Sequence, residues 1–224
     1  MVGSRGRRVR LTVATVQHDK SARHGRMTVM AEILVIRHGQ TEWSANGRHT
    51  SVTDLPLTPQ GEVQAQLLRP ALAGREFAAV MSSPRTRAIR TAELAGLTIT
   101  AVDDDLQEWR YGAYEGVTTA EIRERDPQWD LWQDGCPGGE TPKEVGARLD
   151  RALNRARTFL DRGDVVLVGH GHSLRVATAR WLGQPVAGGA LYLLDTGTIS
   201  ALGFERDQPV LHRWNERPAR DADG

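Results

Sequence analysis

Short, unbroken apolar runs recur along this chain, and helix signals follow most of them. Ile33–Ile36, Phe77–Met81 and Val165–Val168 are the clearest runs. A strand that is apolar at successive positions is buried on both faces, which is typical of a parallel sheet with helices packed on each side. The sequence therefore predicts an α/β protein, a three-layer α/β/α sandwich with a mostly parallel central sheet.

Capping residues and glycines set the expected helix boundaries. A Ser or Thr before Pro predicts a capped helix start, a Thr-x-x-Glu spacing predicts a capping box, and glycine ends a helix. The predicted helices run from Thr58-Pro59 to Gly74, from Ser83-Pro84 to about Gly96, from Thr118, from Thr141 to about Arg162, and over Ser173–Leu182. Weaker runs at 97–102, 192–194, 199–204 and 210–214 complete the predicted sheet, the last three as antiparallel strands.

The expected folded body is residues 31–216, because no internal repeat or low-complexity linker divides them. Residues 1–30 are rich in arginine and lack the long apolar segment of a signal peptide. We interpret them as a disordered basic extension or a start codon assigned too early, and residues 217–224 as a tail. The net charge is +1, but the folded body is mildly acidic, which argues against nucleic acid as a partner.

Composition excludes several further classes of protein. No apolar run approaches the ~20 residues that a membrane-spanning helix needs. Cys136 is the only cysteine, so the chain can form no internal disulfide and no zinc site that requires two thiolates. We expect a cytoplasmic protein without a membrane partner, a metal or a cofactor. The sequence leaves a homo-oligomer open.

Basic and imidazole side chains follow three of the predicted strands. Arg37 and His38 follow the first strand, Arg87 follows the second, and His170 and His172 follow the fourth. The carboxyl ends of parallel strands meet at one edge of a sheet, so these side chains are expected to converge. Arginine forks match the oxygens of a phosphate in pairs. The sequence therefore predicts a polyanion site at this edge.

Two of these histidines are followed by glycine. Gly39 follows His38, and Gly171 follows His170. A Cβ at either position would crowd a ligand that approaches the backbone. The helix predicted to begin near Ser173 would direct its N–H groups at the same ligand.

The surroundings of the histidines predict nucleophilic chemistry. Next to Arg37 and Arg87, an imidazole is expected to have a pKa below its ordinary value, because like charges disfavour the imidazolium. A neutral imidazole can attack phosphorus and form a phosphohistidine. The departing alkoxide needs a proton, and Glu108 beside Trp109 is the candidate acid. Taken singly, His38 could be a structural hydrogen-bonder, Arg87 a solvated residue and Glu108 a surface acid.

Four motifs in this order resemble the histidine phosphatase superfamily, also called the phosphoglycerate-mutase-like fold. They are Arg37-His38-Gly39-Gln40-Thr41, the stretch from Arg87 to Ala92, the segment 108–116, and His170-Gly171. The resemblance implies that His38 is the phosphorylated nucleophile and that Glu108 is the proton donor. It also implies that Arg37, Arg87 and His170 form the phosphate pocket.

Segments 53–58, 103–108, 132–141 and 169–175 are more similar to a sugar-phosphate phosphatase branch, which includes sedoheptulose-1,7-bisphosphatase and acid phosphatases. The resemblance implies a phosphoric monoester hydrolase that acts on a small phosphate ester, a sugar phosphate or bisphosphate. The substrate contacts that we expect are Arg37, Ser44, His49, Thr50, Arg87, Trp109, Gly171 and His172, with Arg175 at the rim.

Two other functions remain open at this stage. One is a phosphoglycerate mutase, although Thr119 and Asp134 stand where such mutases carry cations that hold the second acidic group of their substrate. The other is a non-catalytic scaffold that binds a phosphorylated ligand. The presence of both His38 and Glu108 favours an enzyme over this scaffold.

Overall fold

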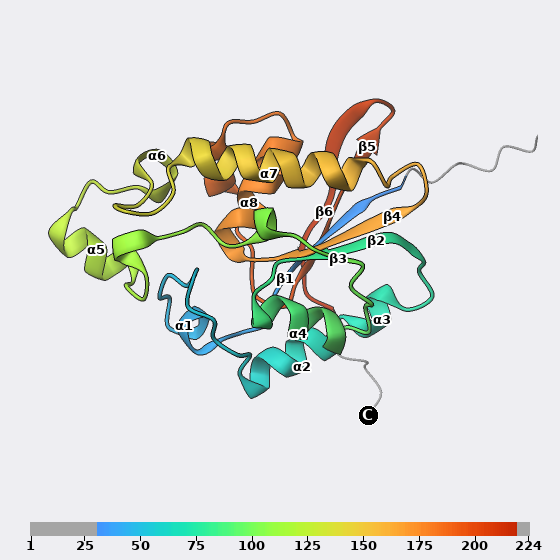
Figure 1. The fold of residues 1–224 in the computed structure, drawn as a ribbon, viewed down its shortest axis with the longest axis horizontal. Coiled ribbons are helices and arrows are strands. Elements are labelled where there is room, and N and C mark those ends of the chain that lie inside the picture. The colour runs from blue at the N-terminus through green and yellow to red at the C-terminus, as the bar shows by residue number, and fades with distance from the viewer. Residues whose placement is uncertain (1–30, 219–224) are drawn as a thin grey trace, which may run out of the picture.

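The computed structural model describes residues 31–218 (Figure 1). The predicted extension, residues 1–30, and positions 219–224 of the predicted tail lie outside the described residues. Within the described range, one sheet has six strands in the order β3-β2-β4-β1-β5-β6. They are β1 Ile33–Arg37, β2 Phe77–Ser82, β3 Ala101–Val102, β4 Asp164–Gly169, β5 Ile199–Glu205 and β6 Gln208–Glu216.

Helices cover both faces of this sheet. Strands β1 to β4 pair in parallel, and β5 and β6 extend the sheet antiparallel beyond β1. Helices α7 (Pro142–Arg157) and α8 (Gly171–Trp181) lie on one face, and α2 (Pro59–Leu67), α3 (Arg69–Leu72) and α4 (Thr86–Leu94) lie on the other (Figure 1). This arrangement confirms the predicted three-layer sandwich with a mostly parallel sheet.

The central strands are buried on both sides, as their unbroken apolar sequences require. In β1, Ile33 and Val35 pack with the core under α7 and α8, whereas Leu34 and Ile36 pack with the core under α2 and α4. All four side chains are inaccessible to solvent. The two-residue alternation of strand side chains therefore builds two separate cores from one sequence run.

Two predicted helices are shorter than expected. The helix predicted from Thr58-Pro59, α2, ends at Leu67, because Pro70 has no N–H to continue the helical hydrogen bonds and lies in the separate turn of α3. Helix α7 ends at Arg157 instead of continuing to about Arg162. The hydroxyl of Thr158 donates to a helix carbonyl there, which competes with a further turn.

Two other boundaries also differ from the prediction. Helix α4 begins at Thr86 rather than directly after Ser83, whose hydroxyl contacts a histidine at the end of β4. Residues 192–194 form no strand, and the backbone carbonyls of this segment accept hydrogen bonds from the side chains of Arg37 and Trp214. Both departures follow from side chains that bond to distant parts of the chain.

Helix α8 begins at Gly171, two residues before the predicted Ser173, and the other predicted helix starts are confirmed. Thr58 caps α2, and complete capping boxes begin α5 (Thr119–Arg125) and α7. Short elements that the pattern does not predict are α1 (Glu42–Ala45), α6 (Leu131–Asp134) and the 3₁₀ turns η1 (Asp104–Leu106), η2 (Gly112–Tyr114) and η3 (Val186–Leu191). No helix in residues 31–218 combines the length and apolarity needed to cross a bilayer.

Candidate active site

The ends of β1 and β4 bring two histidines together. These strands are neighbours with Arg37 paired to Gly169, and a histidine is the next residue on each. The N–H of His38 donates to the Gly169 carbonyl at 3.0 Å. The rings of His38 and His170 lie edge to face with their centroids 5.1 Å apart. The expected convergence at the carboxyl edge of the sheet is therefore present.

The His38 ring is buried and oriented by its own loop. Its Nδ1 lies 2.7 Å from the carbonyl oxygen of Gly39, which can only accept, so Nδ1 carries the proton and Nε2 keeps a lone pair. Burial holds the pKa of His38 well below its ordinary value, and the charges of Arg87 and Arg37 lower it further. The neutral imidazole agrees with the sequence prediction, although burial is the larger cause.

Arg87 and His170 lie next to each other and are both inaccessible to solvent. Nε of Arg87 donates to Nδ1 of His170 at 3.2 Å, and Nε2 of His170 lies 2.7 Å from the hydroxyl of Ser83. Burial and then the charge of Arg87 hold the pKa of His170 well below its ordinary value. Neither side chain lines the cleft into which His38 opens. The two predicted phosphate ligands thus lie beneath the cleft wall in this structure.

Arg87 and Glu115 fix the loop 50–53 from two sides. The Nη atoms of Arg87 donate to the carbonyls of Thr50, Ser51 and Thr53 at 3.1 to 3.3 Å. Oε1 of Glu115 accepts the N–H groups of Ser51 and Thr53 at 2.8 and 3.0 Å. Because a cation takes the carbonyls and an anion takes the N–H groups, the loop is held in one conformation beside the cleft.

The Glu108 carboxylate lies at the N-terminus of α8. Its Oε1 accepts the N–H groups of Trp109 and Ser173 at 2.8 Å each, and its Oε2 accepts the N–H of His172 at 3.0 Å. The sequence predicts that the N–H groups at this helix start face the ligand, but two of them bond to Glu108 instead. The carboxyl group nevertheless lines the same cleft as His38.

His38 and Glu108 open into a cleft of about 210 Å³. Six of the predicted substrate contacts line it: Arg37, Ser44, His49, Thr50, Gly171 and His172. The predicted rim residue Arg175 also lines it, together with Arg48, Tyr111 and Thr119, which were not among the predicted contacts. Residues from segments that are far apart in sequence therefore share one small cavity.

One wall of the cleft is polar but uncharged. The hydroxyl of Tyr111 lies 2.6 Å from Nδ1 of His172, and the hydroxyl of Thr119 lies 3.3 Å from Nε2 of His49. Burial lowers the pKa of His49 to about 4, and burial followed by the charge of Arg175 holds the pKa of His172 well below its ordinary value. At neutral pH this wall offers hydroxyl and imidazole groups without a net charge.

Three arginines bring positive charge to the cleft. Nη1 of Arg37 donates to a backbone carbonyl, and its buried Nε has no partner among residues 31–218. Arg48 is exposed at the rim. The guanidinium of Arg175 lies 4.6 Å from the ring centre of Trp132. Within the described residues, no three His, Cys, Asp or Glu side chains are grouped so as to hold a metal ion.

The close approaches at Gly39 and Gly171 involve protein atoms rather than open ligand space. A Cβ on Gly39 would lie 2.2 Å from the carbonyl oxygen of Gly61, and one on Gly171 would lie 3.2 Å from Cζ of Arg37. The expected role in ligand approach is therefore corrected for Gly39, whereas Gly171 also lines the cleft and its role there stays a prediction. Both glycines let α2 and the Arg37 side chain pack against the strand ends.

Two further residues belong to the core. Trp109 is inaccessible to solvent, and its Nε1 donates to the carbonyl of Glu140 at 2.9 Å, so it is not a contact in this cleft. Cys136 is also buried, and burial raises the pKa of its thiol to about 12. Such a thiol packs in the core and is not a reactive nucleophile.

Comparison with known proteins gives a consistent result. The family described as "Histidine phosphatase superfamily (branch 1)" matches residues 33–217. An acid phosphatase of Mycobacterium tuberculosis is 43% identical over 175 residues, which cover 77% of this chain and 86% of that protein. Sedoheptulose 1,7-bisphosphatase of Saccharomyces cerevisiae is 38% identical over 186 residues, 68% of each chain.

Solved structures show the same relationship. The structure of an open reading frame product from Mycobacterium tuberculosis superposes with a TM-score of 0.82 at 40% identity, covering 84% of this chain and 99% of that one. A mycobacterial glucosyl-3-phosphoglycerate phosphatase, solved with VO3, superposes with a TM-score of 0.72 at 29% identity, covering 83% and 98%. This chain belongs to branch 1 of the histidine phosphatase superfamily and is a phosphoric monoester hydrolase.

Proposed function

We propose that this enzyme hydrolyses a small phosphomonoester, a sugar phosphate or bisphosphate, through a phosphohistidine on His38. The observation that carries the proposal is the state of the His38 ring. Its Nδ1 lies against a carbonyl oxygen, and its Nε2 has no hydrogen-bond partner among residues 31–218. Burial keeps the ring neutral inside a cleft that also holds a carboxyl group. These are the requirements of a nitrogen nucleophile with a nearby acid.

The proposed reaction has two displacements at phosphorus. Nε2 of His38 attacks, the bond from phosphorus to the ester oxygen breaks, and Glu108 gives a proton to the departing alkoxide. Water then attacks the phosphohistidine and loses a proton to the Glu108 carboxylate, while the bond from phosphorus to nitrogen breaks. The arginines near His38 would stabilise the charge that spreads over the phosphoryl oxygens.

The shape and polarity of the cleft support a small polyhydroxylated substrate. About 210 Å³ is room for a compact ester. The uncharged wall of Tyr111, His172, His49 and Thr119 can exchange hydrogen bonds with sugar hydroxyls. Arg48, at the rim, can bind the second phosphate of a bisphosphate. The names of two similar proteins, an acid phosphatase and a sedoheptulose 1,7-bisphosphatase, point to the same class of substrate.

Two experiments test the proposal. A phosphate-release screen of sugar monophosphates and bisphosphates should reveal the preferred ester. Rapid quenching with a radiolabelled substrate should trap an acid-labile phosphate on the protein. His38→Ala should abolish this label, whereas His212→Ala, on β6 and outside the cleft, should retain it. Label that persists in His38→Ala would show that another residue is the nucleophile.

A further inference from the structure

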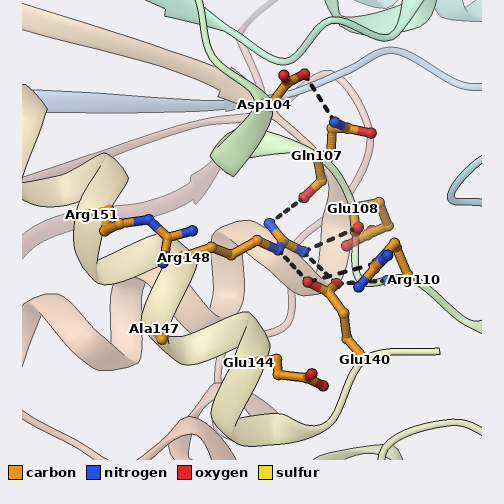
Figure 2. A pocket seen from close by; sticks show the side chains of 9 residues that line it. All are labelled: Asp104, Gln107, Glu108, Arg110, Glu140, Glu144, Ala147, Arg148 and Arg151. Carbon is orange, nitrogen blue, oxygen red and sulfur yellow. Dashed lines mark hydrogen bonds and ion pairs between the residues drawn. The ribbon is translucent and has the colours of Figure 1, made fainter.

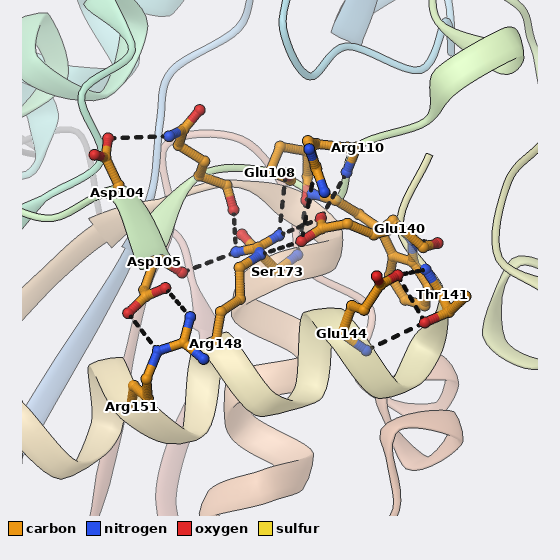
Figure 3. Close-up of polar contacts among 12 residues, drawn as sticks. Asp104, Asp105, Glu108, Arg110, Glu140, Thr141, Glu144, Arg148, Arg151 and Ser173 are labelled. Atoms are coloured by element: carbon orange, nitrogen blue, oxygen red, sulfur yellow. Dashed lines mark hydrogen bonds and ion pairs between the residues drawn. The ribbon is translucent and has the colours of Figure 1, made fainter. Parts of the chain in front are cut away.

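A buried arginine lies directly behind the segment that carries Glu108. Arg148, on α7, donates to the backbone carbonyls of Asp105 and Gln107 at 2.8 Å each and of Glu108 at 3.1 Å (Figure 3). Its side chain is 9% exposed. Arg148 and Glu108 line a cavity of about 450 Å³ (Figure 2). This cavity is separate from the cleft that contains His38, which Glu108 also lines.

Glu140 completes this unit. Its carboxylate accepts Nε and Nη2 of Arg148 at 2.7 and 2.9 Å. The same carboxylate accepts the N–H of Arg110 at 2.9 Å, and the Glu140 carbonyl accepts Nε1 of Trp109. The pair therefore bonds to residues on both sides of Glu108.

The segment needs such support because it has no regular structure. Residues 108–110 lie between the 3₁₀ turns η1 and η2, and no hydrogen bond of a helix or strand satisfies their backbone groups. A buried ion pair is a weak source of stability, since the loss of hydration opposes the attraction of the charges. A fixed position for a catalytic carboxyl is a different benefit, because a displacement of ~1 Å can reduce a rate by ~10²-fold.

We propose that Arg148 and Glu140 are positioning residues for the proton transfer by Glu108, an inference that rests on the proposed function. They hold the 105–110 backbone so that the Glu108 carboxyl meets both the start of α8 and the cleft. A proton donor matters most when the leaving group is a poor one. Loss of the positioning should therefore slow esters of alcohols much more than esters of acidic phenols.

The test compares kcat/KM for p-nitrophenyl phosphate and glycerol 1-phosphate, since kcat/KM reports formation of the phosphoenzyme. Lysine cannot reproduce the arginine fork, so Arg148→Lys should lose ~10²-fold on glycerol 1-phosphate. The loss on p-nitrophenyl phosphate should be about threefold or less, and Glu108→Gln should show the same selectivity. Glu140→Gln keeps the shape of its side chain and should show the same selectivity with a smaller effect. This variant tests the proposal if Arg148→Lys folds poorly.

Arg151→Lys is the matched control. Arg151 lies one turn further along α7 and pairs with the Asp105 carboxylate at 2.6 Å, but it makes no contact with the backbone around Glu108. It should leave both rates unchanged. If Glu108→Gln is selective and both Arg148→Lys and Glu140→Gln slow the two esters equally, or not at all, the positioning role is refuted. If Glu108→Gln itself slows both esters equally, the proton-donor assignment is the part that fails.

Discussion

Acid should destabilise this protein through its buried histidines, and His49 allows the effect to be calculated. The His49 side chain is buried against Tyr111 and contacts the hydroxyl of Thr119. Burial lowers its pKa from 6.5 to about 4, although the charge of Glu115 acts in the opposite direction. Below pH 6.5 the unfolded chain therefore binds a proton at this position that the folded protein does not bind. Stability is lost as the pH falls, until the folded protein is protonated as well.

The magnitude follows from the two pKa values. Acidification from about pH 7.5 to about pH 5.5 should lower the free energy of unfolding by about 1 kcal/mol through His49 alone. The pKa values of His38, His170 and His172 are also held down, first by burial, so these residues should steepen the dependence further. Replacing His49 by a residue that cannot titrate should remove only the contribution of His49 to this pH dependence.

Urea denaturation in phosphate-free buffer at the two pH values measures the contribution of His49. His49→Gln should be less stable than the parent protein at neutral pH, yet its free energy of unfolding should fall by about 1 kcal/mol less on acidification. Thr119→Val is the control, because it removes the hydrogen-bond partner and leaves the imidazole in place. Its pH dependence should match that of the parent protein. An unchanged dependence in His49→Gln would refute the depressed pKa of His49.

Three further predictions concern residues around the site. Gly61→Ala would place a Cβ 2.1 Å from the carbonyl oxygen of Gln40. Urea denaturation should show a free energy of unfolding lower by about 2 to 3 kcal/mol. Unchanged stability would contradict this packing. Glu115→Ala removes the acceptor of two N–H groups in the 51–53 loop, so KM should rise and stability should fall by about 2 kcal/mol. Cys136, with a thiol pKa of about 12, should react with a thiol reagent only after denaturation, and rapid reaction in the folded protein would show that the thiol is accessible.

Much of the fold could be predicted because it depends on local pattern. The apolar run at Ile33–Ile36 requires a strand buried on both faces, and the capping box at Thr141 depends on residues only three apart. The separate start of α4 and the missing strand at 192–194 could not be predicted in this way. They depend on Ser83 and Arg37 bonding to groups that are close only in the folded protein.

The candidate site could likewise be predicted only in part. The meeting of His38 with His170 follows from the rule that parallel strands end at one edge of the sheet. The buried positions of Arg87 and Trp109 do not follow from this rule, because the sequence does not show which way a side chain points. The sequence did not single out Arg148, since α7 carries other arginines that also pair with acids, Arg151 with Asp105 and Arg155 with Asp103. Only the fold distinguishes the one that faces the backbone near Glu108.

The place of Glu108 at the start of α8 also bears on how its proton would move. A carboxyl group that donates a proton becomes an anion, and in this site three N–H donors already point at its oxygens. The positive end of the α8 dipole lies at the same position. Since these groups are fixed before the reaction, no reorganisation is needed when the charge develops. Two N–H groups at the helix start are taken by Glu108, so in the proposed reaction arginine side chains such as Arg37 would stabilise most of the phosphoryl charge.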